Sequence, residues 1–564
     1  MKFALCQGIV RDLRRRIPFY ASDWSDAWDY RVVPATVYMF FAKCVSVPDS
    51  LMTQDIDGLC AVLIPLLSSI LPALAFSLDM FASTDHHYGV TEVLLASVLG
   101  AGIFSLFACQ PLVIVGVTGP ITVFNYTVYD IMHGSDVDYM TFMCWVGLWS
   151  AVLHTVLAVT NSCNLLRYVT RFPCDIFGFY VACIYIQKGV QVLARLDASS
   201  PTEGEAFYLS IALALLVFLV AYAAAKVGES PLFLHAVRVF LADYGTPLTL
   251  VFFTGFVHIG RMRSVDVETL PTGAAFEPTG RSGWIVNPRN ISVSDAFLAL
   301  PFAVLLTILF WFDHNVSSLI AQGTEFPLRK PAGFHWDLFL LGITTGLAGL
   351  LGIPFPNGLI PQAPYHTKSL CVTSLSDPTS SASPALFDAV DDEKPRATLV
   401  VTHVVEQRVS NLAQGLLTLV AMTGPLLDVL HLIPHGVLAG LFFVMGVQAL
   451  EGNGITEKVI FLAQDRQLTP KTHPLRACVR PGSHGIMRNR AIWLFVAIEL
   501  VGFGATFAIT QTIAAVGFPV FIMLLIPVRT LLLPRVFTPE ELAALDGPAA
   551  SPFTMESAGG IHGH

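Results

Sequence analysis

Residues 111–130 read PLVIVGVTGPITVFNYTVYD, an apolar segment that is interrupted near its centre. Its first seven residues would suit the interior of a lipid bilayer, but Thr118, Gly119 and Pro120 follow together, and Asn125 lies beyond them. A backbone broken at membrane depth persists only where it is buried in protein or lines a watery cavity. The interruption is therefore our first candidate for a binding site.

The composition of the whole chain is that of a helical membrane protein. Of its 564 residues, 54% are hydrophobic and only 13% are charged, whereas soluble domains carry about 25% charged residues. Apolar runs long enough to cross a bilayer recur along most of the length. The sequence predicts an all-α polytopic protein whose surroundings are lipid, with no nucleic-acid partner. Its ten cysteines show no metal-ligand spacing, so we expect neither a metal nor a cofactor.

Apolar windows separated by polar breaks predict about fourteen membrane-spanning segments in two sets of seven. The expected segments lie near 59–82, 90–110, 112–131, 138–160, 172–193, 206–226 and 235–259, then near 295–322, 336–354, 357–372, 400–428, 434–451, 491–511 and 513–533. Lysine and arginine gather in the segments that orient towards the cytosol. This bias places both termini in the cytosol.

The same windows divide the chain into five parts. They are a cytosolic N-terminal segment (1–30), a first seven-segment repeat (31–260), an extracellular loop (261–294), a second seven-segment repeat (295–535) and a cytosolic C-terminal tail (536–564).

A second interruption resembles the first in character. Residues 354–369 read PFPNGLIPQAPYHTKS, and Asn357 lies about sixty residues into the second set, as Thr118 does into the first. Interrupted helices at corresponding positions of two halves indicate a transporter built from inverted repeats. The alternative is a pair of proline kinks that neighbouring helices tolerate.

The chemistry of these interruptions favours an anion or a strongly hydrogen-bonding solute. Pro120 suits the first turn of a half-helix, and Thr118 or Gly119 can cap it. The free N–H groups of that turn and the positive end of the helix dipole then face a cavity. A second half-helix starting near 361–364 would face the same place. It would contribute further candidate contacts, namely Gln362, Pro364, His366, Thr367 and Lys368. Lys368 would either contact the solute or extend to the cytosolic surface.

Asp313 is the candidate for ion coupling. It lies in the otherwise apolar stretch LFWFDHNVSSL, residues 309–319, and a carboxylate within the membrane is a functional residue by default. The alternative is a structural carboxylate that is hydrogen-bonded to a helix end. His314, its neighbour, is expected to pack rather than to bind.

Four stretches together resemble a known family. QPLVIVGVTGPITVFNYTVYDI, FWFDHNVSSLIAQ, PFPNGLIPQAPYHTKSL and VVEQRVSNLAQGLL are similar to borate efflux transporters of fungal and plant type, in the bicarbonate/borate family of anion transporters. The resemblance covers nearly all of residues 31–535. It implies a uracil-permease-like fold of two inverted seven-segment repeats. A core domain (segments 1–4 and 8–11) would move against a gate domain (segments 5–7 and 12–14), in a homodimer joined through the gates.

The resemblance also implies a function. The protein would be a secondary transporter that exports borate or boric acid across the plasma membrane, with the vacuolar membrane as a second location, coupled to protons or another ion. Asp313 falls where chloride/bicarbonate exchangers carry a glutamate linked to proton coupling, Gln362 where they carry an arginine, and Asn125 where they carry a glutamate. These departures favour a neutral or weakly acidic polyol. Bicarbonate or chloride exchange and nucleobase–proton symport remain alternatives on the same fold. A polytopic membrane enzyme is disfavoured, because no catalytic motif is present.

One stretch departs from the family pattern. Residues 43–70 separate RVVPATVYMFFA from LPALAFSLDMF, two pieces that the family joins in one helix. They are either an insertion, such as an intron retained in the gene model, or a genuine interfacial helix before a first span at 59–82.

Overall fold

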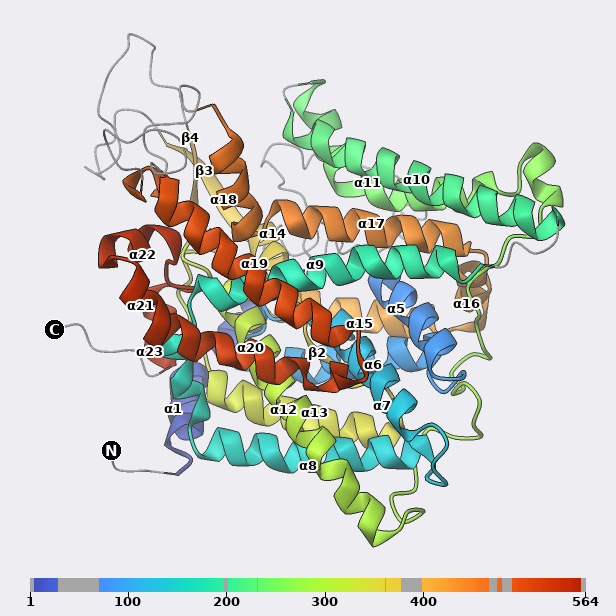
Figure 1. The fold of residues 1–564 in the computed structure, drawn as a ribbon, viewed down its shortest axis with the longest axis horizontal. Coiled ribbons are helices and arrows are strands. Elements are labelled where there is room, and N and C mark those ends of the chain that lie inside the picture. The colour runs from blue at the N-terminus through green and yellow to red at the C-terminus, as the bar shows by residue number, and fades with distance from the viewer. Residues whose placement is uncertain are drawn as a thin grey trace.

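The computed structural model describes residues 5–28, 70–196, 201–230, 232–360, 362–376, 398–465, 474–478 and 489–558. Within these ranges the chain is mainly helical, with two short antiparallel strand pairs (Figure 1). The expected insertion at 43–70 lies outside the described residues except for Ile70, where the first long helix begins.

The first half contains α1 (Gln7–Arg16), α2 (Tyr20–Ser25), α5 (Ile70–Ser83), α6 (Val90–Phe107), β1 (Val115–Gly116), α7 (Gly119–Met132), α8 (Tyr139–Val159), α9 (Arg171–Ala194), α10 (Pro201–Glu229) and α11 (His235–Phe256). The second half contains α12 (Val293–Ala321), α13 (Phe334–Leu351), β2 (Asn357–Gly358), α14 (Gln362–Ser369), β3 (Cys371–Ser376), β4 (Thr398–Val404), α15 (Val409–Ala421), α16 (Gly424–His431), α17 (His435–Glu451), α18 (Gly454–Ala463), α19 (Arg490–Thr510), α20 (Phe518–Pro527), α21 (Leu533–Val536), α22 (Pro539–Leu545) and α23 (Pro552–Ser557).

Eight helices of the described chain are long and apolar enough to cross a membrane. Two further pairs, α15 with α16 and α17 with α18, pass the same test together but bend by 82° and 67°. The structure therefore confirms a polytopic helical protein with eight to ten candidate spans among the described residues. The count of fourteen stays a prediction, because α5, α7, α11 and α14 fall on expected segments without being complete spans by this test.

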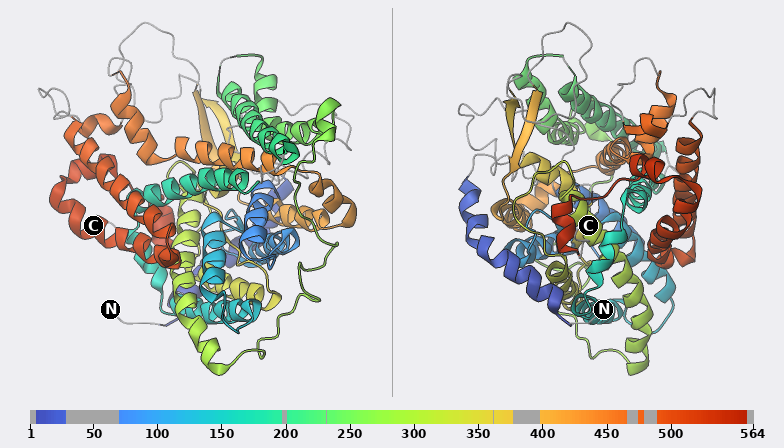
Figure 2. Two further views of the ribbon diagram at one scale, coloured as in Figure 1. Left: turned by 45° about the vertical axis from the view of Figure 1, so that its right-hand side comes forward. Right: turned by 90° about the vertical axis from the view of Figure 1, so that its left-hand side faces the viewer.

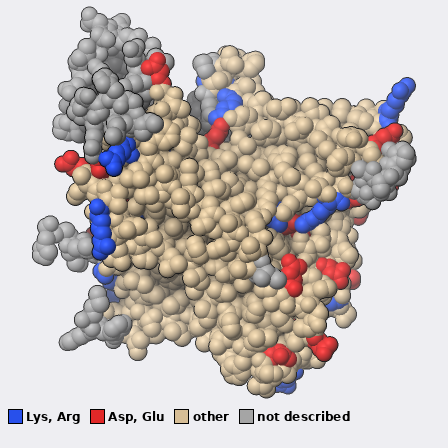
Figure 3. All heavy atoms as spheres, in the orientation of Figure 1, with Lys and Arg blue, Asp and Glu red and all other residues tan. Residues whose placement is uncertain are grey.

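The long helices run side by side, and charged side chains gather at their ends. In Figure 1, α8, α9, α10 and α17 lie nearly horizontal, with α1, α18 and α22 at the left; we call this the α1 end and the other the opposite end. On the face shown in Figure 3, most charged residues lie towards these two ends. Exposed residues on the long helices, such as Leu219, Phe252 and Val501, are apolar. The apolar surface between the two ends suits the hydrocarbon of a bilayer.

Packing along the helices forms two groups. α8 packs against α12 and α13, and α6 against α15. α9 packs against α17 and α19, and α10 lies between α11 and α17, as the two views of Figure 2 show. α5 and α7 lie where the two groups meet. α5 contacts α6 of the first group and α17 of the second, and α7 contacts both α5 and α9.

The expected span over 400–428 is wrong at its start. Residues 398–404 form β4, which pairs antiparallel with β3, and α15 begins only at Val409. The sequence of β4, TLVVTHV, is rich in β-branched residues, which favour strands over helices. Its hydrophobicity alone suggested a membrane helix, and the all-α prediction missed this hairpin.

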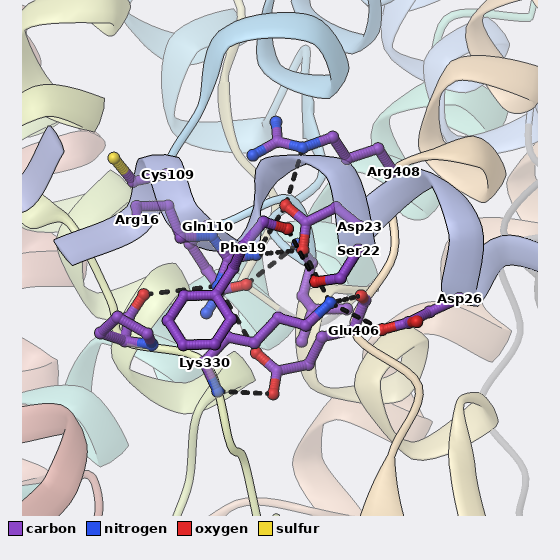
Figure 4. Close-up of polar contacts among 12 residues, drawn as sticks. Arg16, Phe19, Ser22, Asp23, Asp26, Cys109, Gln110, Lys330, Glu406 and Arg408 are labelled. Carbon is purple, nitrogen blue, oxygen red and sulfur yellow. Dashed lines mark hydrogen bonds and ion pairs between the residues drawn. The ribbon is translucent and has the colours of Figure 1, made fainter. Parts of the chain in front are cut away.

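A buried ion network fastens the N-terminal segment to the α1 end. Asp23, which follows α1, accepts hydrogen bonds from Arg16 at 2.8 Å, from Lys330 at 2.9 Å and from Arg408 at 2.9 Å (Figure 4). Glu406 accepts from the backbone N–H of Lys330 at 2.9 Å and lies 3.8 Å from Arg16. Burial raises the pKa of Glu406, and the Arg16 guanidinium opposes that shift. The charges are thus stable only while they remain paired.

Two neighbouring carboxylates, those of Asp12 and Asp337, connect the N-terminal segment with the start of α13 and with residues 109–110. Asp12 accepts from the backbone of His335 at 2.8 Å, and Asp337 accepts from the backbone N–H groups of Cys109 and Gln110 at 2.6 and 3.0 Å. Gln110 leads directly into the interrupted segment. The N-terminal segment therefore helps to position the entry to the first interruption.

We expect Asp23→Asn to destabilise the protein strongly, because three buried cations would lose their shared carboxylate. Removing one partner of a buried ion network costs about 3–5 kcal/mol. The measurement is the melting temperature of detergent-purified protein, followed by size-exclusion chromatography. Asp26→Asn is the matched control, since its side chain is 45% exposed and contacts only Lys330 of these cations. Equal melting temperatures for the two variants would contradict this account.

Candidate functional site

The two interruptions lie against each other. β1 and β2 pair antiparallel, with Val115 opposite Gly358 and Gly116 opposite Asn357, and the backbone N–H of Leu359 donates to Ile114 O at 2.9 Å. Each pairing satisfies backbone groups that would otherwise be unpaired at membrane depth. The structure thus brings together the two segments that the sequence marked as similar.

A half-helix follows each strand. α7 begins at Gly119, with Thr118 at its N-cap in an extended conformation and Pro120 in its first turn. α14 begins at Gln362. Because the strands are antiparallel, the two helices leave in opposite directions and both N-termini face the pairing. Their first-turn N–H groups and positive dipole ends therefore point towards one region between them.

Two polar side chains at these helix starts have spare hydrogen-bonding capacity. Thr118 Oγ1 and Gln362 Oε1 are buried and have no hydrogen-bond partner among the described residues. A buried polar atom without a partner is costly unless something else satisfies it. A hydroxyl-rich solute between the half-helices would supply such partners.

Helix α12 places Asp313 beside the paired strands β1 and β2, where the two interrupted segments cross; we call this place the crossing. Asp313 Oδ2 accepts a hydrogen bond from Asn357 Nδ2 at 2.9 Å, and Asn357 Oδ1 accepts from the backbone N–H of Gly358 at 2.8 Å. All three residues are buried. A Cβ atom at Gly358 would lie 2.9 Å from Ser317 Cβ, so this close approach of β2 to α12 requires glycine. The coupling candidate is therefore connected to the interrupted backbone itself.

Asn357 is a candidate site residue that the sequence analysis did not assign. Its position after Pro356 and before Gly358 is typical of a turn, a pattern that gives no indication of a side-chain role. A signal was available, because a buried carboxylate such as Asp313 requires a hydrogen-bond donor. The sequence analysis also did not assign Ser317 of α12, whose Oγ is buried without a partner among the described residues.

Other predicted contacts occupy different surroundings. His366 is fully buried and its two ring nitrogens lie 2.9 Å from Leu112 O and 2.8 Å from Ser410 Oγ, and Thr367 donates to Ala321 O at 2.8 Å. Asn125, which lies beyond the first turn of α7, donates a hydrogen bond to Met80 Sδ at 3.5 Å. In this state these contacts hold helices together. Their assignment as solute contacts stays a prediction.

A cavity leads from the α1 end to the second half-helix. It has a volume of about 980 Å³ and is lined by residues of α9, α12, α14, α17 and α18, among them Pro364 and Lys368, and by Ile360, which lies between β2 and α14. Lys368 is exposed, in agreement with either of its expected roles. The α14 side of the crossing is therefore accessible from the α1 end.

The other side of the crossing is closed by aromatic rings. A Cβ atom at Gly119 would lie 3.4 Å from both Phe76 Cζ of α5 and Tyr185 Cε1 of α9. The ring of Phe76 lies 5.6 Å from that of Tyr185 and 5.4 Å from that of Phe442 of α17, between centroids. These rings separate the start of α7 from the opposite end.

Comparison with known proteins identifies the family. The family model described as the HCO3- transporter integral membrane domain matches residues 4–48, 47–206 and 196–550. The chain belongs to this family. Among its relatives, Boron transporter 1 of Saccharomyces cerevisiae is 41% identical over 98% of this chain and 87% of its own length. A Schizosaccharomyces pombe protein whose name describes it provisionally as a transporter is 50% identical over 95% of both chains.

A solved structure supports the same fold at low sequence identity. The structure of SLC26A9 superposes with a TM-score of 0.51 at 10% identity, covering 92% of this chain and 70% of that chain. The fold is therefore shared with a protein of much lower sequence identity.

We expect Gly119→Val to abolish transport, because its side chain would enter the space held by Phe76 and Tyr185 at the start of α7. The measurement is solute flux in vesicles that contain equal amounts of folded protein. Gly102→Val is the matched control, since a Cβ atom there meets nothing within 4 Å. Normal flux with Gly119→Val would remove the start of α7 from the transport path.

Proposed function

We propose that this protein is a secondary transporter that exports borate or boric acid across the plasma membrane. The observation that carries the proposal is the meeting of two half-helix starts at the uncharged side chains of Thr118 and Gln362. The 41% identity to a protein named as a boron transporter supports the choice of solute.

The chemistry of the solute fits such a site. Boric acid carries three hydroxyl groups and no charge, and tetrahydroxyborate carries four hydroxyl groups and one negative charge. Both donate and accept hydrogen bonds, so they match an amide oxygen, a threonine hydroxyl and the N–H groups of two helix starts. The helix dipoles favour the anionic form without a fixed cation at position 362.

The proposed topology has fourteen segments in two inverted repeats. The α1 end is cytosolic, in accord with the arginines of α1 and the basic loops at that end. α5 to α8 and α12 to α15 form the core domain, and α9 to α11 and α17 to α21 form the gate domain. Dimers join through the gate domains, where α10 exposes apolar side chains such as Leu215 and Leu219.

The structure then corresponds to an inward-open state. The solute enters from the cytosol through the cavity, passes Lys368 and Pro364, and binds between the half-helices. Movement of the core against the gate separates Phe76 from Tyr185 and Phe442, and the solute leaves on the outer side. Asp313 couples this movement to a proton or another cation, since a buried ionised carboxylate requires a partner.

The test of the proposed function is boron accumulation in a yeast strain that lacks its own boron exporter. With boric acid in the medium, cells that express this protein should contain less boron than cells with the empty vector. Equal boron contents, with the protein present at the cell surface, would refute borate export.

Asp313→Asn should leave a folded protein that has lost coupling. The amide keeps the shape and a hydrogen-bonding oxygen near Asn357 but does not titrate. We expect net boron efflux from reconstituted vesicles to fall at least tenfold, and its dependence on an imposed pH gradient to disappear. An unchanged rate with the wild-type pH response would show that Asp313 is structural.

Gln362→Arg should weaken borate transport and admit stronger anions. A fixed cation at the start of α14 would favour chloride or bicarbonate electrostatically. The measurement compares boron flux with chloride flux in the same vesicles, and Gln362→Asn is the uncharged control. Unaltered boron kinetics without new chloride flux would place residue 362 outside the solute path.

A further inference from the structure

An ion cluster lies beyond the aromatic rings, towards the opposite end. Asp79 of α5 pairs through Oδ2 with Lys188 Nζ at 2.7 Å and through Oδ1 with Arg195 Nη2 at 2.9 Å. Lys188 Nζ also lies 4.4 Å from the centroid of the Tyr126 ring, and Arg195 donates to Ser83 Oγ at 3.0 Å. The cluster thus connects the end of α5 with the end of α9.

The burial of the three charged groups is graded. The side chain of Asp79 is 0% exposed, that of Lys188 is 4% exposed and that of Arg195 is 39% exposed. Two cations therefore surround one carboxylate, with Arg195 at the boundary to solvent and Lys188 inside. This is the arrangement of a small anion bound by two cationic side chains, except that the anion belongs to the protein.

The two cations come from one helix and the anion from another. Lys188 lies on α9, and Arg195 directly follows the last residue of that helix with a helical backbone conformation. The two are seven residues apart, which is about two helical turns, so they lie on the same side of α9. Asp79 is contributed by α5, which packs with α6 and α7. Under the proposed function, α9 belongs to the gate and α5 to the core. The contact must therefore break when the two domains move.

We propose that Lys188 and Arg195 form an outer binding site for a small oxyanion such as tetrahydroxyborate, and that Asp79 occupies this site in the inward-open state. The inference rests on the proposed function and adds a second solute site to it. When the core moves, the carboxylate of Asp79 withdraws and the cations receive the departing anion. When the core returns, Asp79 displaces that anion to the outside.

A second cluster shows what a purely structural arrangement looks like in this protein. Lys458 pairs with Glu499 at 2.6 Å and with Asp175 at 3.1 Å. Its members lie on α18, α19 and α9, all within the proposed gate domain, and two carboxylates hold one cation. That cluster has no excess positive charge, and core movement does not separate it. Of these two clusters, the outer one alone combines an excess of positive charge with a contact between the two proposed domains.

The test compares variants that lack the Asp79 carboxylate with variants that lack one of the two cations, because the two kinds of change should shift the apparent affinity for external borate in opposite directions. Uptake of boron into vesicles is measured against external borate at alkaline pH, where tetrahydroxyborate predominates. Asp79→Asn should lower the half-saturating external concentration several-fold, because the carboxylate that competes with borate for Lys188 and Arg195 is gone. Lys188→Gln and Arg195→Gln should each raise it about tenfold, the effect of losing one charge-assisted hydrogen bond. The half-saturating internal concentration for efflux should stay within twofold of wild type.

Lys226→Gln is the matched control, because it removes a lysine that pairs with Glu451 at 3.0 Å within the proposed gate domain and should leave the external half-saturating concentration unchanged. A structural ion pair would instead make Asp79→Asn and Lys188→Gln change that concentration in the same direction, and this result would overturn the proposal.

If the wild-type protein shows no boron flux, the proposed function is refuted. The outer site is then tested by measuring anion binding to the purified protein directly. That measurement is the rise in melting temperature of purified Asp79→Asn protein with bicarbonate, a small oxyanion, at constant ionic strength. Such a rise, absent in the Asp79→Asn, Lys188→Gln double variant, supports the site. Its absence from the Asp79→Asn single variant rules the site out.

Discussion

The antiparallel pairing of β1 with β2 is the interaction on which the rest of the structure depends. Two extended segments at membrane depth would leave their N–H and C=O groups without water or helix partners, and each unpaired group is expensive there. The register Val115–Gly358 and Gly116–Asn357 satisfies them mutually. Since neither segment can be extended alone, each half of the chain requires the other. The half-helix starts, the close approach of α12 and the position of Asp313 all follow from this crossing.

The two sides of the crossing are unlike each other in the described chain. Towards the α1 end, α14 borders a cavity that contains polar and charged side chains. Towards the opposite end, α7 begins beneath packed aromatic rings and, beyond them, a buried ion cluster. A transporter must expose its site to one side at a time, and an asymmetry of this kind is what one such state requires. Aromatic contacts between helices are individually weak enough to exchange during a cycle.

Much of the arrangement could be predicted from the sequence, because the strongest signals were local. Pro120 after Gly119 and the PNG of the second interruption mark breaks in apolar segments without reference to other parts of the chain. Asp313 was visible as a carboxylate within an apolar span. The hydrogen bond from Asn357 to Asp313 was not visible, since it joins residues 44 apart whose relation depends on the crossing. The β4 strand was mistaken for a helix because an apolar window does not distinguish a strand at the surface from a membrane span. The contacts of His366 and Thr367 likewise depend on neighbours that only the fold supplies.

The buried network around Asp23 has a consequence for the biosynthesis of the chain. Asp23 leaves the ribosome early, but Lys330 follows it by 307 residues and Arg408 by 385 residues. Until both have been synthesised and their flanking helices inserted, Asp23 and Arg16 have only each other. The N-terminal segment therefore cannot dock until most of the membrane domain exists, and its docking is a late step of assembly. A nascent chain that stalls before residue 408 would display this segment undocked, and quality-control factors could distinguish that form from the finished protein.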